Sequence, residues 1–153
     1  RTRPAGLPPA ALALVSRIET APSDLHRSGA AKGEVDPADA VYVVLPYNYL
    51  VSTNEYLKYV DTYLLPQTNG WLREGVLKNY EVHLNRYPAG RYWSSLLVLQ
   101  YRSDDALGGR DAAMAKVRAE LAVSDPAWKA ASESKQGIRE GRQYIIADRL
   151  LVD

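Results

Sequence analysis

The chain has 153 residues, 19 basic and 18 acidic side chains, a net charge of +1, and no cysteine. This length fits a single domain with an adequate core. The lack of cysteine excludes thiol catalysis, iron–sulfur clusters, thiolate zinc sites and disulfides. Charges of both signs are dispersed without a basic block, so nucleic-acid binding is not expected. No apolar run approaches the roughly 18–20 residues that cross a bilayer, so no transmembrane segment is expected.

Residues 1–38 are predicted to form an N-terminal arm. Five prolines interrupt a stretch that is rich in alanine, serine and glycine. Pro9 suits the first turn of a short helix that continues to Glu19. Residues 23–37 are interpreted as an extended linker, because glycines and prolines interrupt every regular pattern there. The domain itself is therefore expected to occupy residues 39–153.

The domain is predicted to begin with a strand at residues 39–50, rich in β-branched and aromatic side chains. Because proline lacks the N–H that a sheet ladder needs, this strand is expected to end, bulge or lie at an edge near Pro46. A helix capped by one of residues 52–54 should follow. Pro66 is expected to end or kink that helix, and Gly75 to terminate it.

Residues 75–102 carry the clearest pattern in the chain, that of a β-hairpin. Apolar and polar side chains alternate along residues 80–85, as in a strand with two different faces. Proline, alanine and glycine at 88–90 form the turn. The unbroken apolar run at 96–99 is typical of a strand covered on both faces. The second arm is therefore expected to be central in its sheet.

After the hairpin, a second helix is predicted from about residue 105 to 123, and a short third helix from 127 to about 136, anchored by Trp128. The last strand is predicted at residues 142–152. In chain order these elements give β-α-β-β-α-β with a short extra helix before the last strand, which is the ferredoxin-like order. We expect an α+β fold with a four-stranded antiparallel sheet, helices on one face, and a dimer that covers the other face.

Eleven tyrosines and three tryptophans, with no phenylalanine, are the unusual feature of the composition. A phenol hydroxyl needs water or a partner, so many of these rings are expected to be half-buried at pockets or subunit contacts. Ten tyrosines lie in or beside the first predicted helix and the strands around it. They are interpreted either as the lining of an aromatic ligand pocket or as core and interface residues.

A resemblance to the dimeric α/β-barrel superfamily covers residues 40–152. It rests on the element order, on the hairpin sequence LNRYPAG and on the segment DPAWKAASESKQ before the last strand. Within that superfamily, the chain is similar to small, mostly uncharacterised bacterial proteins with a removable export signal. The superfamily includes cofactor-independent monooxygenases, isomerases of small cyclic acids, haem-dependent enzymes and members without known chemistry. The resemblance implies a fold, with a pocket between the sheet and its helices, more strongly than it implies a function.

Four hairpin residues are candidate catalytic residues: His83, Asn85, Trp93 and Arg86. Asn85 and Trp93 are expected to lie nearly opposite each other across the turn. The resemblance adds that monooxygenases of this family hold a phenolic or quinol substrate with side chains of these types. Histidine suits acid/base work near neutral pH, although the favoured interpretation of His83 is a polar residue on the solvent or interface side of a strand. No metal or other cofactor is expected, because the two histidines are separated and lie outside the predicted helices.

Two functions are compatible with these features, and whether the protein is an enzyme stays open. The first hypothesis is a non-catalytic accessory or scaffolding subunit. Its sheet face and N-terminal arm would bind a protein partner, a second copy, or a larger envelope or membrane-associated assembly. The alternative is a cofactor-independent monooxygenase or isomerase-like enzyme for a small aromatic or cyclic substrate. The chain begins at Arg1 rather than methionine, which favours an exported, periplasmic protein, with a cytoplasmic location as the alternative.

Overall fold

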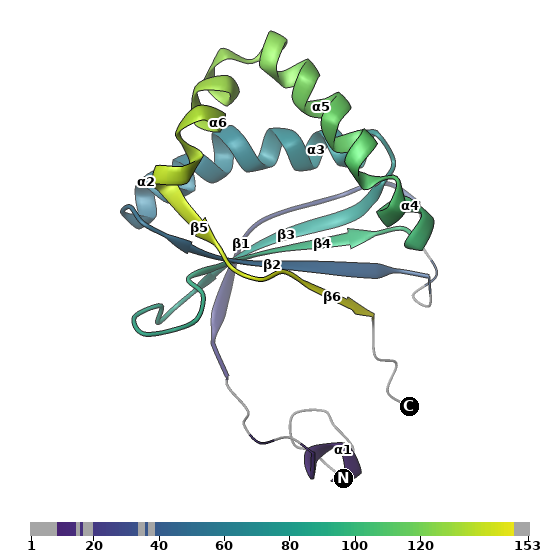
Figure 1. The fold of residues 1–153 in the computed structure, drawn as a ribbon, viewed down its shortest axis with the longest axis vertical. Coiled ribbons are helices and arrows are strands. Elements are labelled where there is room, and N and C mark those ends of the chain that lie inside the picture. The colour runs from purple at the N-terminus through teal and green to yellow at the C-terminus, as the bar shows by residue number, and fades with distance from the viewer. Residues whose placement is uncertain (1–8, 15, 17–19, 34–35, 37–38, 149–153) are drawn as a thin grey trace.

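The computed structural model describes residues 9–14, 16, 20–33, 36 and 39–148. A layer of helices covers one face of a single antiparallel sheet (Figure 1). The described helices are α1 (Pro9–Leu12), α2 (Thr53–Tyr59), the π-helix η2 (Val60–Leu64), α3 (Leu65–Arg73), α4 (Asp104–Gly108), α5 (Arg110–Ser124) and α6 (Pro126–Ile138). The described strands are β1 (Ser23–Ala30), β2 (Val41–Tyr49), β3 (Leu77–Asn85), β4 (Ser95–Tyr101), β5 (Arg139–Gly141) and β6 (Ile145–Asp148).

The strand order is β1-β3-β4-β2, and both β5 and β6 pair with the remaining side of β2. The first and third strands of the predicted β-α-β-β-α-β order, β2 and β4, therefore lie side by side in the centre. This arrangement is ferredoxin-like, as predicted, and β4 is central as expected. The prediction of four strands is wrong, because the sheet has six strands among the described residues. One extra strand is β1, and the other comes from the division of the last strand into β5 and β6.

β1 corrects the interpretation of residues 23–37 as a linker. Ser23–Ala30 pairs antiparallel with β3, from Ser23 opposite Asn85 to Ala30 opposite Asn79. An edge strand of this kind is held by backbone hydrogen bonds, which need no apolar alternation in its sequence. The described sheet therefore begins at Ser23, within the segment assigned to the arm.

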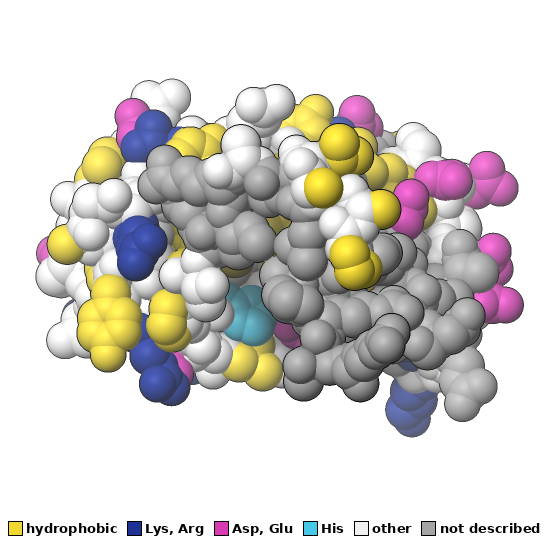
Figure 2. All heavy atoms as spheres, turned by 90° about the horizontal axis from the view of Figure 1, so that it is seen from below, with side chains coloured by type: hydrophobic (Ala, Val, Ile, Leu, Met, Phe, Trp, Pro, Cys, Tyr) yellow, Lys and Arg dark blue, Asp and Glu magenta, His cyan; other side chains and the backbone are white. Residues whose placement is uncertain are grey.

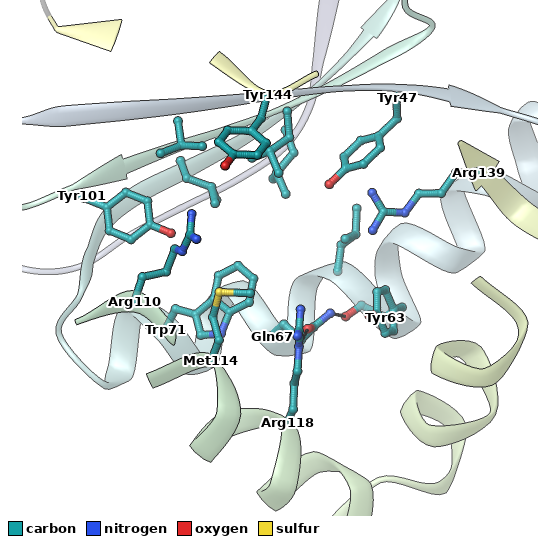
Figure 3. A pocket seen from close by; sticks show the side chains of 15 residues that line it. Tyr47, Tyr63, Gln67, Trp71, Tyr101, Arg110, Met114, Arg118, Arg139 and Tyr144 are labelled. Atoms are coloured by element: carbon teal, nitrogen blue, oxygen red, sulfur yellow. Dashed lines mark hydrogen bonds between the residues drawn. The ribbon is translucent and has the colours of Figure 1, made fainter. Parts of the chain in front are cut away.

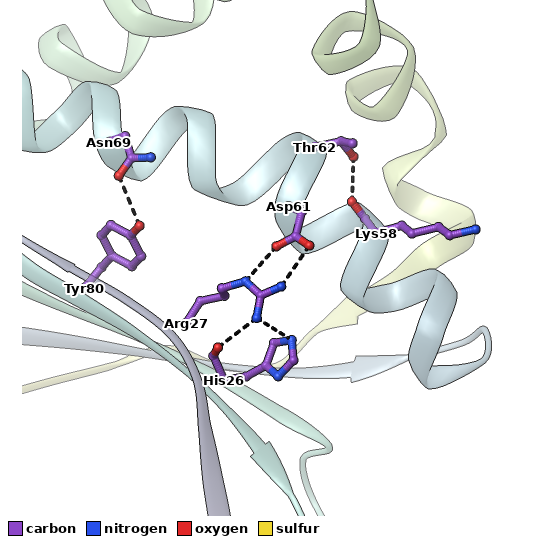
Figure 4. Close-up of polar contacts among 7 residues, drawn as sticks. All are labelled: His26, Arg27, Lys58, Asp61, Thr62, Asn69 and Tyr80. Atoms are coloured by element: carbon purple, nitrogen blue, oxygen red, sulfur yellow. Dashed lines mark hydrogen bonds and ion pairs between the residues drawn. The ribbon is translucent and has the colours of Figure 1, made fainter.

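Two side chains join β1 to the rest of the fold. The Arg27 guanidinium donates from Nε and Nη2 to the two carboxylate oxygens of Asp61 in η2, at 2.9 and 3.0 Å (Figure 4). Gly29 lies directly on the ring of Tyr80, where a β-carbon would overlap the ring. The Tyr80 hydroxyl in turn donates to Asn69 Oδ1 of α3 at 3.0 Å. An edge strand with little apolar surface is thus tied to the helix layer by polar contacts.

The predicted boundaries also change at the two ends of the chain. α1 begins at Pro9, as predicted, but spans only Pro9–Leu12, and residues 15 and 17–19 of the expected continuation lie outside the described residues. The strand predicted at 142–152 is replaced by β5, which starts at Arg139, and by β6. Residues 149–152 of that prediction lie outside the described part of the chain.

Pro46 lies within β2, which continues to Tyr49 instead of ending at the proline. The interruption occurs instead in the segment that pairs with β2, because β6 pairs with Val41–Val44 and β5 pairs with Tyr47–Tyr49. Between these two ladders, the Arg142 N–H donates to the carbonyl of Pro46 at 2.9 Å. A strand partner that is split next to the proline is compatible with the missing donor.

Pro66 does not end the helical segment, which continues to Arg73. Immediately before the proline the chain forms the π-helix η2, and the Leu65 N–H donates to the carbonyl of Val60. A proline inside an α-helix removes one hydrogen bond and clashes with the carbonyl four residues earlier. A π-helical turn relieves such conflicts, and it commonly marks functional regions.

Aromatic stacking accounts for much of the tyrosine content. Tyr49, Tyr56, Tyr59, Tyr63 and Trp128 form a continuous series of stacked rings, with neighbouring centroids 4.8–6.2 Å apart. Three of these tyrosines follow each other at helical spacing on α2 and η2, so one face of the helix presents all three rings. Stacked rings of this kind each contribute about 0.5–1.5 kcal/mol beyond their burial.

Figure 2 shows the molecule from the side of the sheet that points away from the layer of helices α2–α6, and α1 lies on this side in Figure 1. Val44 of β2, together with Leu96 and Val98 of β4, lies on this face and is half-buried. Their neighbours in each strand point to the helix layer, since side chains alternate along a strand. β4 thus has apolar side chains on both faces of the sheet. They are half-buried on this face and buried on the face toward the helices.

We expect Gly70→Ala to destabilise the protein by about 1–3 kcal/mol. Gly70 of α3 faces Val117 of α5, and a β-carbon at this position would overlap the valine side chain. Urea unfolding followed by circular dichroism measures the effect. Gly137→Ala is the matched control, because this helical glycine of α6 has no atom within 4 Å of an added β-carbon. The control should gain about 0.5–1 kcal/mol from helix propensity. Equal stabilisation of both variants would contradict the close approach of α3 and α5.

Candidate functional site

A cavity of about 200 Å³ lies between the sheet and the helix layer (Figure 3). Its floor consists of alternate residues of β2 and β4, which share the helix-facing side of the sheet. These floor residues are Val43, Leu45, Tyr47, Leu97, Leu99 and Tyr101. Residues of η2, α3 and α5 form the opposite wall, and Arg139 and Tyr144 complete the lining beside β5 and β6. The exposed side chains of Arg118 and Tyr144 mark the side that opens to solvent.

The polar groups of the cavity are arginines, tyrosine hydroxyls, one glutamine and one indole N–H. Three of the lining residues are arginines: Arg110, Arg118 and Arg139. Within the described chain, no aspartate, glutamate, histidine or lysine lines the cavity. The cavity is therefore positively charged, with walls made of apolar and aromatic side chains.

Arg139 is the most buried of these cations. Its Nε donates to the Tyr59 hydroxyl at 2.9 Å, and its guanidinium carbon lies 3.7 Å from the centroid of the Tyr47 ring. Its Nη1 is buried and has no hydrogen-bond partner in the part of the chain that the structure describes. Burial lowers the pKa of Arg139, but Tyr47 and Tyr59 raise it, and the net shift is upward. The guanidinium is thus a permanent charge, held in place by two tyrosines.

The opposite end of the cavity in Figure 3 contains Arg110, Tyr101 and Trp71. Burial raises the pKa of Tyr101 to about 12, although the neighbouring Arg110 acts in the other direction. The Trp71 side chain is 5% exposed, and its Nε1–H has no acceptor. Arg110 contacts Asp111 outside the cavity, with Nε 3.1 Å from Oδ1. At neutral pH this end therefore presents a neutral phenol and a cation.

Gln67 of α3 connects η2 and α5 within the helical wall of the cavity. Its side chain is 1% exposed, its Nε2 donates to the Tyr63 carbonyl at 3.0 Å, and its Oε1 accepts from Arg118 Nε at 2.9 Å. Buried amides of this kind are rarely left without partners, and here both ends of the amide are satisfied. Arg118 is thereby occupied at the rim, in contrast to Arg139.

Of the candidate catalytic residues predicted from sequence, His83 and Arg86 lie outside the cavity. His83 alternates with the core residue Val82, so it lies on the face away from the helices, where its Nε2 is 2.8 Å from Glu81 Oε2. Arg86 Nε donates to Asp24 Oδ1 at 2.8 Å, at the exposed start of β1. His83 makes a hydrogen bond with Glu81, Arg86 makes a surface ion pair with Asp24, and neither side chain lines the cavity.

Asn85 and Trp93 come together across the turn, as predicted, but they also lie outside the cavity. The Asn85 Nδ2 donates to the Trp93 carbonyl at 3.1 Å, and its Oδ1 accepts from the Tyr87 N–H at 3.0 Å. Asn85 is 5% exposed, so these bonds satisfy a buried amide and shape the hairpin loop. A catalytic role for the four hairpin residues stays a prediction.

Sequence reasoning missed the three arginines of the cavity. Arg110 and Arg118 belong to the exposed side of a predicted helix, and Arg139 precedes the expected start of the last strand. An arginine at such a position has no signal of its own in a single sequence. The tyrosine content was the available signal, because Tyr47, Tyr63, Tyr101 and Tyr144 all line the cavity.

Comparison with known proteins adds a similarity of fold. No protein-family model and no curated protein matches the chain. Similar solved structures include a dimeric protein of unknown function and ferredoxin-like fold from Bacteroides fragilis, with 18% identity, a TM-score of 0.44, and coverage of 73% of this chain and 97% of that chain. Candidate monooxygenases from Fusobacterium nucleatum and Lactobacillus acidophilus are 15% and 12% identical, with TM-scores of 0.48 and 0.38.

The matched region spans 55% and 44% of those two candidate monooxygenases, and it spans 91% and 74% of this chain. Identities and TM-scores this low support no inference about the activity of this chain. The cavity is therefore the feature from which a function is inferred. No helix among the described residues is long and apolar enough to span a membrane.

Proposed function

We propose that the protein binds a small organic molecule with a single ring in the cavity between its sheet and its helices. The cavity volume of about 200 Å³ carries this proposal. It exceeds the roughly 150 Å³ of an apolar cavity that admits benzene, and it lies below the range of about 300–1,000 Å³ that is typical for drug-sized ligands. One ring with a small substituent is the ligand size that fits.

The lining favours a ring over a flexible chain. Tyr47, Tyr101, Tyr144 and Trp71 supply aromatic surfaces around the cavity, and Leu97 and Leu99 supply an apolar floor. Aromatic rings prefer offset or edge-to-face contacts with other rings, and these contacts orient a planar ligand. The few polar groups at the two ends then select its substituents.

An enzyme acting on such a ring compound is the second candidate, and the cation-rich lining favours it. A buried guanidinium stabilises negative charge that develops on a substrate. Burial raises the pKa of the lining residue Tyr101 to about 12, so this phenol is a weaker acid than a free one. The chain would then hold and polarise the substrate without supplying a strong base. Product analysis by mass spectrometry, after incubation of a bound ring compound in air, distinguishes turnover from binding.

The interaction hypothesis is supported by a different surface, the sheet face that carries Val44, Leu96 and Val98. We propose that a second copy of the chain covers this face, because half-buried apolar side chains there gain burial in a symmetric contact. Val98→Glu should then convert a dimer into a monomer in analytical ultracentrifugation. An unchanged sedimentation coefficient would contradict a contact through this face. The membrane-associated assembly stays a prediction.

We expect Leu45→Phe to weaken ring binding by tenfold or more, because the larger side chain fills part of a cavity of about 200 Å³. The measurement is calorimetric titration with a series of single-ring compounds that includes neutral and charged members. Leu25→Phe is the matched control, since Leu25 is 55% exposed on β1 and does not line the cavity. The proposal fails if no ring compound binds, or if both variants bind as the unchanged protein does.

A further inference from the structure

We propose that the ligand of this cavity carries a carboxylate, and that the guanidinium of Arg139 binds it. The inference rests on the proposed function, because it names the chemical class of the molecule that the cavity takes. It follows from the unbalanced charge of Arg139, from the composition of the lining, and from the way in which two tyrosines hold the guanidinium.

Arg139 has no carboxylate partner among the described residues. Its neighbour Glu140 lies 3.3 Å from the Nη2 of Arg142 instead. Its contacts are the Tyr59 hydroxyl and the Tyr47 ring, neither of which is a carboxylate, and within the described chain its Nη1 has no acceptor. A largely buried charge without a counter-ion is costly, and structures retain one where an anion compensates it. An anionic ligand supplies that compensation.

The rest of the lining provides no competing negative charge. All three formal charges in the described lining are positive, and the nearest acidic partner, Asp111, contacts Arg110 with a side chain that is 85% exposed. In a cavity with apolar walls, such charges act with less screening than in water. The cavity is therefore attractive to an anion and unfavourable for a cation. Rings that carry a positively charged ammonium group are not expected as ligands.

The geometry of Arg139 favours a carboxylate over other anions. The Tyr59 hydroxyl accepts from Nε, and the Tyr47 ring covers one face of the guanidinium at 3.7 Å. Figure 3 shows Arg139 beside Tyr47 at one end of the cavity, and Nη1 is the guanidinium nitrogen without a hydrogen-bond partner among the described residues. A planar carboxylate accepts a charge-assisted hydrogen bond from such a planar guanidinium. Because the guanidinium is already held, little conformational entropy is lost when the ligand binds.

The remaining cavity then accommodates the ring. Arg139 and Trp71 lie apart from each other across the cavity in Figure 3, and Leu97 and Leu99 belong to its floor. A carboxylate at Arg139 therefore directs its ring toward Trp71, Tyr101 and Met114. A benzoate-sized acid satisfies both the charge and the volume.

The experiment compares benzoate with benzamide, which has nearly the same shape but no charge. Both are titrated calorimetrically at neutral pH and low salt into the unchanged protein, Arg139→Gln, and Arg91→Gln. Arg91 is the matched control, because it is an exposed arginine that does not line the cavity. Circular dichroism verifies that each variant is folded.

We expect benzoate to bind at least tenfold more tightly than benzamide. Arg139→Gln should lower benzoate affinity about 10- to 100-fold and leave benzamide affinity nearly unchanged, whereas Arg91→Gln should change benzoate affinity less than threefold. Equal affinity of benzoate and benzamide for the unchanged protein would overturn the proposal that the ligand carries a carboxylate. The proposed ring-binding function would stand after that result. Unchanged benzoate binding by Arg139→Gln overturns the role of Arg139. If no ring compound binds at all, the proposed function itself fails.

Discussion

Raising the pH from 10 to 12 is expected to unfold the protein cooperatively, because buried tyrosines must ionise. Tyr56, Tyr59 and Tyr101 are 0%, 4% and 1% exposed. Burial raises the pKa of Tyr56 and of Tyr101 to about 12, against the opposing hydrogen bond from Tyr56 to Ser95, and it raises the pKa of Tyr59 as well. An unfolded chain ionises its tyrosines near pH 10.

The direction in which the free energy of unfolding changes with pH depends on whether the folded or the unfolded chain retains its phenolic protons. Below pH 10, both the folded and the unfolded chain hold the three phenolic protons, so this contribution to stability is fully present. Between pH 10 and 12, the unfolded chain loses protons that the folded chain retains, so each tyrosine lowers the free energy of unfolding by about 1.4 kcal/mol per pH unit. Three such groups remove roughly 4 kcal/mol per pH unit, which is comparable to the total stability of about 5–15 kcal/mol of a small domain.

The titration is followed by tyrosinate absorbance and by far-ultraviolet circular dichroism on the same samples. We expect both signals to change together in one cooperative step between pH 10 and 12. Tyr87→Phe is the control, because Tyr87 is 68% exposed and its removal should leave the midpoint unchanged. If all tyrosines ionise gradually around pH 10 while the circular dichroism stays native, the buried phenols do not limit stability.

Trp128→Ala is expected to destabilise the protein by about 3–5 kcal/mol. Trp128 is 4% exposed and is the buried residue of α6. Its ring stacks on Tyr63 at 5.5 Å between centroids, and its Nε1 donates to the Tyr63 carbonyl at 3.2 Å. Alanine removes the ring from the end of the aromatic series and leaves a cavity between α6 and η2, so α6 loses its main attachment.

Urea unfolding measures this effect, and two variants serve as controls. Trp128→Phe keeps a ring but loses the Nε1 donor, so it should cost less than Trp128→Ala. Trp93→Ala truncates the same residue type in the hairpin loop, where Trp93 is only half-buried, and should cost less still. A loss below 1 kcal/mol for Trp128→Ala would show that α6 is held by other contacts.

Local sequence patterns predicted the elements that depend on local contacts. The Ser52 cap is an example, because its side chain and the Glu55 carboxylate satisfy each other's backbone N–H groups within one turn. The Tyr80–Leu84 alternation likewise placed the hairpin and its core face. The sequence did not predict β1 as a strand, because its pairing depends on β3, about 50 residues away, and its own side chains are mainly polar.

The candidate site was predictable only in its residue types. The tyrosines and the pocket between sheet and helices agree with the structure, but His83, Asn85, Trp93 and Arg86 do not line that pocket. Hairpin residues are adjacent in sequence, so their proximity was visible, whereas the face on which each points depends on register and on what covers the sheet.

The amino-acid sequence by itself determined the ferredoxin-like order of elements, because hydrophobic periodicity and capping are properties of short segments. Only the tertiary structure decided which residues make the cavity. Arg110, Arg118 and Arg139 come from two elements that follow the hairpin, and they meet Tyr47 only when the last helices fold back over the sheet. The significance of Arg139 lies in the absence of a carboxylate partner among the described residues, and no linear pattern records such an absence.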